Sequence, residues 1–170
     1  SLQERAAVAN ARHGDIFVSV HLNALQPASA KGIETYYLGA SDGPERDAIA
    51  ATENQDSGDS LSDLRSLLER IYADARRDES RRLAERVQQS LMRAARQVDP
   101  ELTNRGVKMA PFVVLVATEM PAILAEVSCL SNADEVTRLN TPGYRQTLAE
   151  ALASGIQAFA NAERTGSSGS

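Results

Sequence analysis

The sequence predicts an α/β fold in which a mostly parallel sheet is flanked by helices on both faces. Segments with a helical repeat alternate along the chain with short apolar segments rich in β-prone residues. Two of these apolar segments, 112–117 and 122–130, are continuous, which is typical of strands buried on both faces. The length of 170 residues is enough for one domain with a sizeable core.

The first forty residues contain a predicted helix and two predicted strands. Apolar side chains recur at near-helical spacing over 2–12, and Gly14 stands where that helix should end. The β-prone run 16–22 predicts the first strand, and the alternating segment 32–39 predicts the second.

Residues 41–80 differ in character from the segments around them. Charged and small polar residues dominate up to Asp63, and a helical pattern resumes over 64–75. A connection of this length is usually either functional or mobile, so we interpret it as an insertion with helical content.

The second half of the chain is predicted to contain three helices and the two apolar strands. The first helix covers 79–98 and places Leu83, Val87, Leu91 and Ala95 on one face. Ser131 and Asn132 are suited to cap a short helix over 133–139, and a last helix follows over 142–162. Residues 163–170 are expected to form a flexible tail.

Composition excludes several classes of protein. The net charge of −5 argues against a nucleic-acid-binding protein, which needs clustered Lys and Arg to neutralise phosphates. Cys129 is the only cysteine, so neither an internal disulfide nor a cysteine metal cluster can form, and we expect it to pack as a small hydrophobe. No apolar run approaches the roughly 20 residues that span a bilayer, so no membrane span is expected.

Two ionisable residues stand where an α/β sheet usually carries its ligand site. His21 closes the first predicted strand, and Glu126 lies inside an otherwise apolar one. Taken singly, each has a common structural explanation: His21 bonded to a loop carbonyl, and Glu126 paired with Lys108 or Arg105. Taken as a pair, they favour a metal ligand and a general base for metal-activated water. His13, by contrast, is expected to be a surface cation at a helix end.

A family resemblance adds to this interpretation. The segments "DIFVSVHLNA", "KGIETYYL" and "PAILAEVSCLSNADEV" resemble, in this order, the zinc-dependent N-acetylmuramoyl-L-alanine amidases. The resemblance implies hydrolysis of the amide bond between N-acetylmuramic acid and L-alanine in peptidoglycan, during cell-wall remodelling and the separation of daughter cells. It implies Zn²⁺ as the cofactor, His21 as a metal ligand and Glu126 as the catalytic carboxylate.

The other two family ligands, a histidine and a glutamate, have no counterpart here and are expected upstream of Ser1. Residues 1–162 are therefore expected to be a catalytic domain without its N-terminal part, inactive as a fragment because catalytic zinc needs three protein ligands. We expect the intact enzyme to be exported to the periplasm or cell envelope, with its signal outside this chain. Two other classes stay open at this stage: a peptidoglycan-binding module without catalysis, and a zinc peptidase.

The 41–80 insertion resembles the segment that covers the active site in amidases acting in cell division. The resemblance places Glu53 against the zinc, where a carboxylate would displace water and stop hydrolysis. A protein activator that contacts the insertion would then release the site. The alternative for Glu53 is one more solvated charge in an acidic loop.

Overall fold

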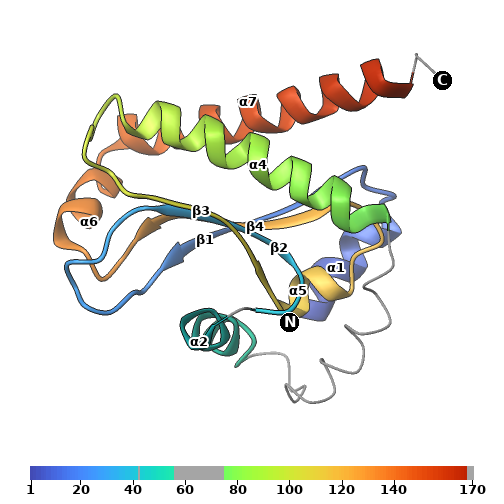
Figure 1. Ribbon diagram of the computed structural model, residues 1–170, viewed down its shortest axis with the longest axis horizontal. Helices are drawn as coiled ribbons and strands as arrows, with labels where there is room; N and C mark the ends of the chain where they lie inside the picture. Colours follow the sequence, from blue (N-terminus) through green and yellow to red (C-terminus); the bar gives the residue numbers. More distant parts are fainter. Residues whose placement is uncertain (42, 56–74, 168–170) are drawn as a thin grey trace. The chain divides into compact units, whose positions relative to one another are not determined.

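The computed structural model describes residues 1–41, 43–55 and 75–167. Among these residues, four strands form one sheet flanked by helices, which confirms the predicted mixed α/β fold. The strands are β1 (Phe17–Asn23), β2 (Ile33–Leu38), β3 (Asn104–Ala110) and β4 (Ala122–Cys129). Their order in the sheet is β1-β4-β2-β3 (Figure 1).

Backbone hydrogen bonds at the ends of the strands define their directions. Phe17 N donates to Pro121 O at the start of β1 and β4, and Leu130 N donates to Asn23 O at their ends. Residue numbers therefore rise in the same direction along both strands, so these strands run parallel. The bonds Ile33 N to Thr103 O and Gly39 N to Ala110 O show the same for β2 and β3. Parallel pairing is what the continuous apolar sequence of β4 predicts.

The chain divides into two units, and each strand contributes residues to both. Unit 1 consists of Ser1–Ser19, Tyr36–Arg81 and Lys108–Leu124, and unit 2 consists of Val20–Thr35, Arg82–Val107 and Ala125–Ser170.

In unit 1, α1 (Leu2–Ala11) contacts α5 (Val113–Val116). Asn10 links the two helices, because its Nδ2 donates to Ala117 O at 2.9 Å and its Oδ1 accepts from Glu119 N at 3.0 Å. The core of this unit includes an edge-to-face pair of the Tyr36 and Phe112 rings, with centroids 5.1 Å apart.

The helix α5 corrects the strand predicted over 112–117. A short apolar run has the same composition in a buried helix as in a buried strand, so its sequence does not distinguish the two. Here Leu115 N and Val116 N donate to Phe112 O, which closes a helical turn directly after Pro111. The sheet has a strand, β3, that the sequence pattern did not reveal, in place of the strand predicted over 112–117.

The 41–80 insertion is helical where the structure describes it. Helix α2 (Pro44–Glu53) begins with Pro44 at a position where the missing N–H is of no consequence. The apolar pattern over 64–75 falls almost entirely on residues outside the described part of the chain.

Helix α4 (Ala75–Ala95) belongs to unit 2 from Arg82 onwards, and there it runs side by side with α7 (Pro142–Ser167) along one face of the sheet (Figure 1). The predicted apolar face of α4 is confirmed, since Leu83, Val87, Leu91 and Ala95 are fully buried. Gly155 of α7 makes the close approach possible: a Cβ at this position would lie 2.7 Å from Val87 Cα. The helix α7 continues past its predicted end at Ala162, so residues 163–167 are helical rather than part of a tail.

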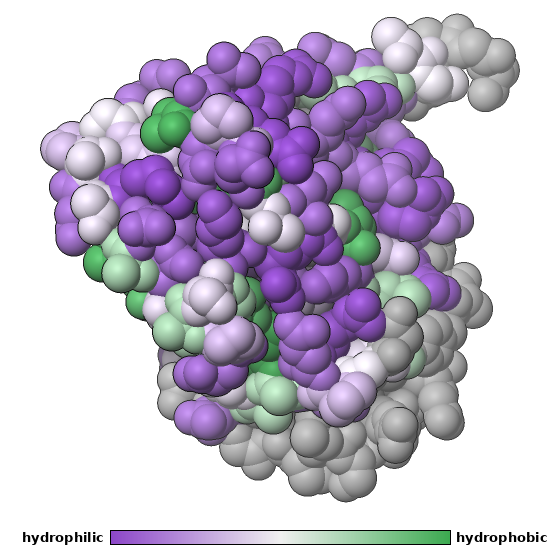
Figure 2. Space-filling model, turned by 60° about the vertical axis from the view of Figure 1, so that its left-hand side comes forward, coloured by the Kyte–Doolittle hydropathy of each residue, from purple (hydrophilic) through white to green (hydrophobic). Residues whose placement is uncertain are grey.

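The strand β1 forms one edge of the sheet and exposes Val20 and Leu22 on one of its faces. The molecular face seen in Figure 2 is largely hydrophilic, with scattered apolar residues. Within residues 1–41, 43–55 and 75–167, no helix combines the length and hydrophobicity of a transmembrane segment.

Candidate active site

His21 lies in β1 and is half-buried. Side chains alternate between the faces of a strand, so His21 shares its face with Asn23, while Val20 and Leu22 occupy the other face. The exposure along β1 follows this alternation, with Asn23 buried and Leu22 exposed. The histidine is therefore directed away from the exposed apolar side chains of its own strand.

Glu126 lies in β4, the strand next to β1, and is fully buried. All of the residues of β4 are buried, and Ala125 and Val127 flank Glu126 in the sequence. A ligand atom of His21 and a carboxylate oxygen of Glu126 lie within 4.8 Å of each other. The structure thus brings together the two residues that the sequence singled out, both of them in unit 2.

The donor atoms of this pair, an imidazole nitrogen and a carboxylate oxygen, are of the kinds that bind a metal ion such as zinc. Zinc binds imidazole nitrogen and carboxylate oxygen at about 2.0–2.2 Å, so two ligand atoms of one ion lie at most about 4.2 Å apart. The upper bound of 4.8 Å on the separation of the His21 and Glu126 ligand atoms is close to this span, so the pair suits a single metal ion. A separation at the upper end of this bound would place Glu126 within reach of a water on an ion held by His21.

A buried polar network extends from the His21 face of β1. Asn23 Nδ2 donates to Glu34 Oε1 at 2.6 Å, and Arg105 Nε donates to Glu34 Oε2 at 3.0 Å. Glu34 is fully buried and Asn23 nearly so. The sequence pattern does not reveal this network. Arg105, predicted as one possible partner of Glu126, forms an ion pair with Glu34 instead.

The segment after β4 supports the loop that follows β1. Asn132 caps α6 (Ala133–Leu139) as predicted, with Oδ1 accepting from Asp134 N and Glu135 N. Ser131 instead donates to Leu25 O at 2.7 Å. Glu135, fully buried, accepts hydrogen bonds from Ser128 Oγ and the backbone N–H groups of Gly32 and Cys129.

The backbone of Gly32 approaches β3 too closely for any other residue. Its φ is +124°, and a Cβ would lie 2.2 Å from Thr103 O. Together with the contacts of Glu135, this fixes the start of β2 and therefore the position of Glu34 two residues later.

Cys129 is buried, as expected for a small hydrophobe. His13 is exposed just beyond α1, with φ at 51°, so it follows the helix rather than lying within its last turn.

Glu53 lies in unit 1, at the C-terminal end of α2, and is half-buried. The next residue, Asn54, is buried, and its side chain bridges Pro111 O and Val113 N at 2.9 Å each. These bonds hold the end of α2 to the start of α5. Within unit 1, the backbone that carries Glu53 is therefore firmly anchored.

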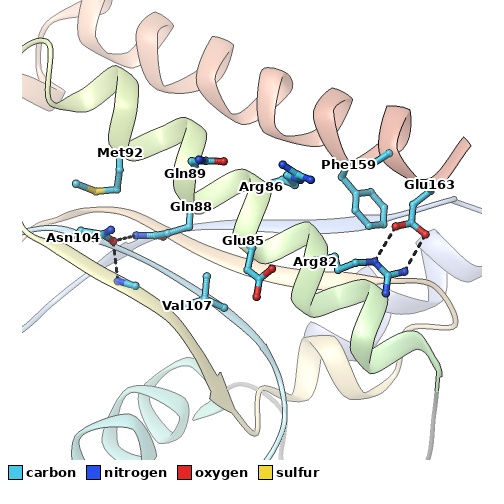
Figure 3. A pocket seen from close by; sticks show the side chains of 12 residues that line it. Arg82, Glu85, Arg86, Gln88, Gln89, Met92, Asn104, Val107, Phe159 and Glu163 are labelled. Atoms are coloured by element: carbon cyan, nitrogen blue, oxygen red, sulfur yellow. Dashed lines mark hydrogen bonds and ion pairs between the residues drawn. The ribbon is translucent and has the colours of Figure 1, made fainter. Parts of the chain in front are cut away.

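A separate cavity of about 610 Å³ lies in unit 2 between α4, β3 and α7 (Figure 3). The guanidinium of Arg82 is bonded to Glu163 through two hydrogen bonds of 2.9 and 3.0 Å, and Gln88 Nε2 donates to Asn104 Oδ1 at 2.7 Å. Neither His21 nor Glu126 lines this cavity. Two of its charged groups, Arg82 and Glu163, form an ion pair with each other.

Comparison with protein families matches residues 1–158 to Amidase_3, described as N-acetylmuramoyl-L-alanine amidase. The chain is 31% identical over 166 residues to N-acetylmuramoyl-L-alanine amidase AmiC of Neisseria meningitidis, covering 92% of this chain and 38% of that protein. It is 30% identical to the uncharacterized protein YqiI of Bacillus subtilis, covering 94% of this chain and 58% of the relative.

Solved structures agree with these matches. An N-acetylmuramoyl-L-alanine amidase from Clostridium difficile 630 aligns with a TM-score of 0.66 and 26% identity, covering 95% of this chain and 66% of that structure. AmiC2 of Nostoc punctiforme aligns with a TM-score of 0.63 and 27% identity, over the same shares. The chain thus spans about two thirds or less of the proteins that it matches.

Proposed function

The chain belongs to the N-acetylmuramoyl-L-alanine amidase family, and from that premise we propose that it forms part of a zinc-dependent enzyme that hydrolyses the amide between N-acetylmuramic acid and L-alanine in peptidoglycan. The observation that supports this most directly is the pairing of His21 with the buried Glu126 at neighbouring strands. Family membership favours an amidase over the zinc peptidase that the sequence left open.

The proposed roles follow from the chemistry of the two side chains. Bound zinc supplies a Lewis acid that polarises the scissile carbonyl and lowers the pKa of water towards about 7. His21 holds the ion through a ring nitrogen. Glu126 accepts the proton of the attacking water and delivers it to the L-alanine nitrogen as the C–N bond breaks. The products are the free carboxylate of the lactyl group and a stem peptide with a free amino terminus.

The family resemblance implies two further zinc ligands, a histidine and a glutamate, in addition to His21. We propose that they belong to the portion of the protein that corresponds to the rest of its relatives' length. The 170-residue chain alone is then expected to bind zinc weakly and to leave peptidoglycan intact.

We also propose that Glu53 restrains the enzyme by competing with water for the zinc. Its place at the end of an anchored helix supports this, because Asn54 fixes the local backbone. In the full-length protein, Glu53→Ala should raise the basal rate of peptidoglycan hydrolysis. Glu45→Ala, an acidic residue in the first turn of the same helix, is the control and should leave the rate unchanged. Equal rates for Glu53→Ala and wild type would reject the restraint.

The 41–80 insertion is then the surface on which we expect a protein activator to act. An activator should raise the rate of the wild type and have little further effect on Glu53→Ala. We place this activity in the cell envelope, after export, because peptidoglycan is found there.

The proposed function is tested on purified peptidoglycan with the full-length protein. Soluble stem peptides should appear with the wild type, disappear after treatment with a chelator, and return when Zn²⁺ is added. His21→Ala should lose both zinc binding and peptide release, whereas Glu163→Gln, at the separate cavity, should retain both. Binding to peptidoglycan without any release of peptide would instead support a non-catalytic binding module.

A further inference from the structure

Glu34 is a fully buried carboxylate that the proposed reaction does not use. A charge in such a place is costly unless hydrogen bonds and an opposite charge compensate it. Both are present, since Asn23 Nδ2 lies 2.6 Å from one oxygen and Arg105 Nε lies 3.0 Å from the other. The hydrogen bond from Asn23 and the ion pair with Arg105 therefore stabilise the buried charge of Glu34.

The two residues on either side of Glu34 are held from the opposite face of the sheet, Ile33 by its backbone oxygen and Thr35 by its side-chain hydroxyl. Gln88 of α4 donates from Nε2 to Ile33 O at 2.9 Å and accepts from Thr35 Oγ1 at 2.8 Å. Gln88 is itself buried. These bonds hold β2 from the helical side and direct Glu34, whose side chain alternates with those of its neighbours, towards the face that carries Asn23.

The contact between Asn23 and Glu34 passes over an intervening strand. Asn23 belongs to β1 and Glu34 to β2, and β4, the strand of Glu126, lies between them in the sheet. The backbone oxygen of Asn23 also accepts from Leu130 N at 2.7 Å, directly after β4. The end of β1 is thus held to β4 by its backbone and to β2 by its side chain.

We propose that Glu34 is a positioning residue for the metal centre: through Asn23 it holds the end of β1 and so orients the His21 ring towards the ion, while Arg105 supplies the countercharge. This inference rests on the proposed zinc-dependent function. His21 lies two residues before Asn23 on the same face of β1, so a change in the strand end is transmitted to the imidazole over a single strand repeat. Partners beyond the metal ligands typically alter metal affinity by 10–100-fold.

The test measures metal binding by the full-length protein rather than activity alone. Glu34→Gln keeps the size of the side chain but loses the charge that holds Arg105. Zn²⁺ affinity, measured by competition with a chromogenic chelator, should fall by about tenfold. The visible absorption bands of the Co²⁺-substituted protein should also change, because they report the geometry of the ligands.

Asn23→Ala removes the link to β1 and leaves the Glu34–Arg105 ion pair in place, so it tests the proposal even if Glu34→Gln fails to fold. It should reproduce the loss of affinity and the Co²⁺ spectrum of Glu34→Gln, and the double variant should show no further loss. Glu163→Gln is the matched control: it removes a carboxylate from another arginine ion pair of unit 2 and should behave as wild type.

Wild-type zinc affinity and an unchanged Co²⁺ spectrum in folded Asn23→Ala would overturn the positioning role. So would equal losses in Glu163→Gln. A wild-type protein that binds no zinc would overturn the proposed function itself. This outcome is distinguishable from failure of the positioning role, because it is seen in the wild type without any variant.

Discussion

His21 and Glu126 could both be identified from the sequence, because each is an ionisable residue in an apolar strand segment. Asn23, Glu34 and Arg105 could not. Their contacts depend on which strands lie side by side, since Asn23 reaches Glu34 past β4 and Arg105 reaches it from the neighbouring β3, and the order of strands in a sheet is not encoded in the local pattern of any one strand. Residue chemistry therefore singled out the pair for which we propose a role in catalysis, and only the tertiary arrangement revealed the hydrogen bonds and the ion pair of Asn23, Glu34 and Arg105.

Glu126→Gln separates proton transfer from metal binding. The amide keeps the shape of the buried side chain but accepts no proton from water, so hydrolysis by the full-length enzyme should fall by about 10²–10⁴-fold. Zinc content, measured by elemental analysis, should stay at the wild-type level. Retention of more than a tenth of the wild-type rate would contradict the role of Glu126 as general base.

Ionisation of Tyr144 is expected to make the stability of the folded protein depend on pH under alkaline conditions. Burial, together with the nearby negative charge of Glu135, raises the pKa of Tyr144 above its usual value of 10.0. Above about pH 10 the unfolded chain then loses a proton that the folded state retains. The stability that this group contributes is complete below pH 10 and is lost as the pH rises towards the folded-state pKa.

Tyr144→Phe should remove that part of the alkaline decline. The Tyr144 hydroxyl has no hydrogen-bond partner among residues 1–41, 43–55 and 75–167, so its loss should not destabilise the protein at pH 7 and can stabilise it by up to about 1 kcal/mol. Urea unfolding at pH 7 and at pH above 10 measures both effects. An alkaline decline as steep as in the wild type would show that another group causes it.

At the scale of helices and strands, amphipathic pattern was a reliable guide and continuous apolar sequence was not. The stripe Leu83 to Ala95 correctly predicted the buried face of α4, since its spacing fits only a helix. Residues 112–117 were wrongly predicted as a strand. The strand β3 was missed because it is an edge strand, with polar side chains and Gly106 at a φ of +83°.

The contact between α4 and α7 depends on one glycine. Gly155→Ala would place a methyl group 2.7 Å from Val87 Cα and 3.0 Å from Arg86 O, so the helices would have to separate. We expect a loss of about 1–3 kcal/mol in the free energy of unfolding. Chemical denaturation measures this loss directly.

Gly143→Ala, in the same helix, is the control for helix propensity. A Cβ at Gly143 meets nothing within 4 Å, so this change should leave stability equal or higher by up to about 1 kcal/mol. Equal free energies of unfolding for Gly155→Ala and Gly143→Ala would show that stability does not depend on the close approach of the helices at Gly155.

At the scale of the whole molecule, the family relationship extends over residues 1–158, but the chain corresponds to only part of its relatives. The resemblance identified from three sequence segments is confirmed by the family match and by the solved amidases. The acidic composition agrees with a substrate other than nucleic acid.

The central claim concerns which bond is cut, and mass spectrometry of the products from purified peptidoglycan tests it most directly. With zinc present, the full-length protein should release stem peptides that begin with a free L-alanine, and should leave glycan strands whose muramic acid keeps its lactyl carboxylate. A chelator should prevent both products. Cleavage within the glycan or within the peptide, or cleavage that a chelator does not affect, would contradict the account.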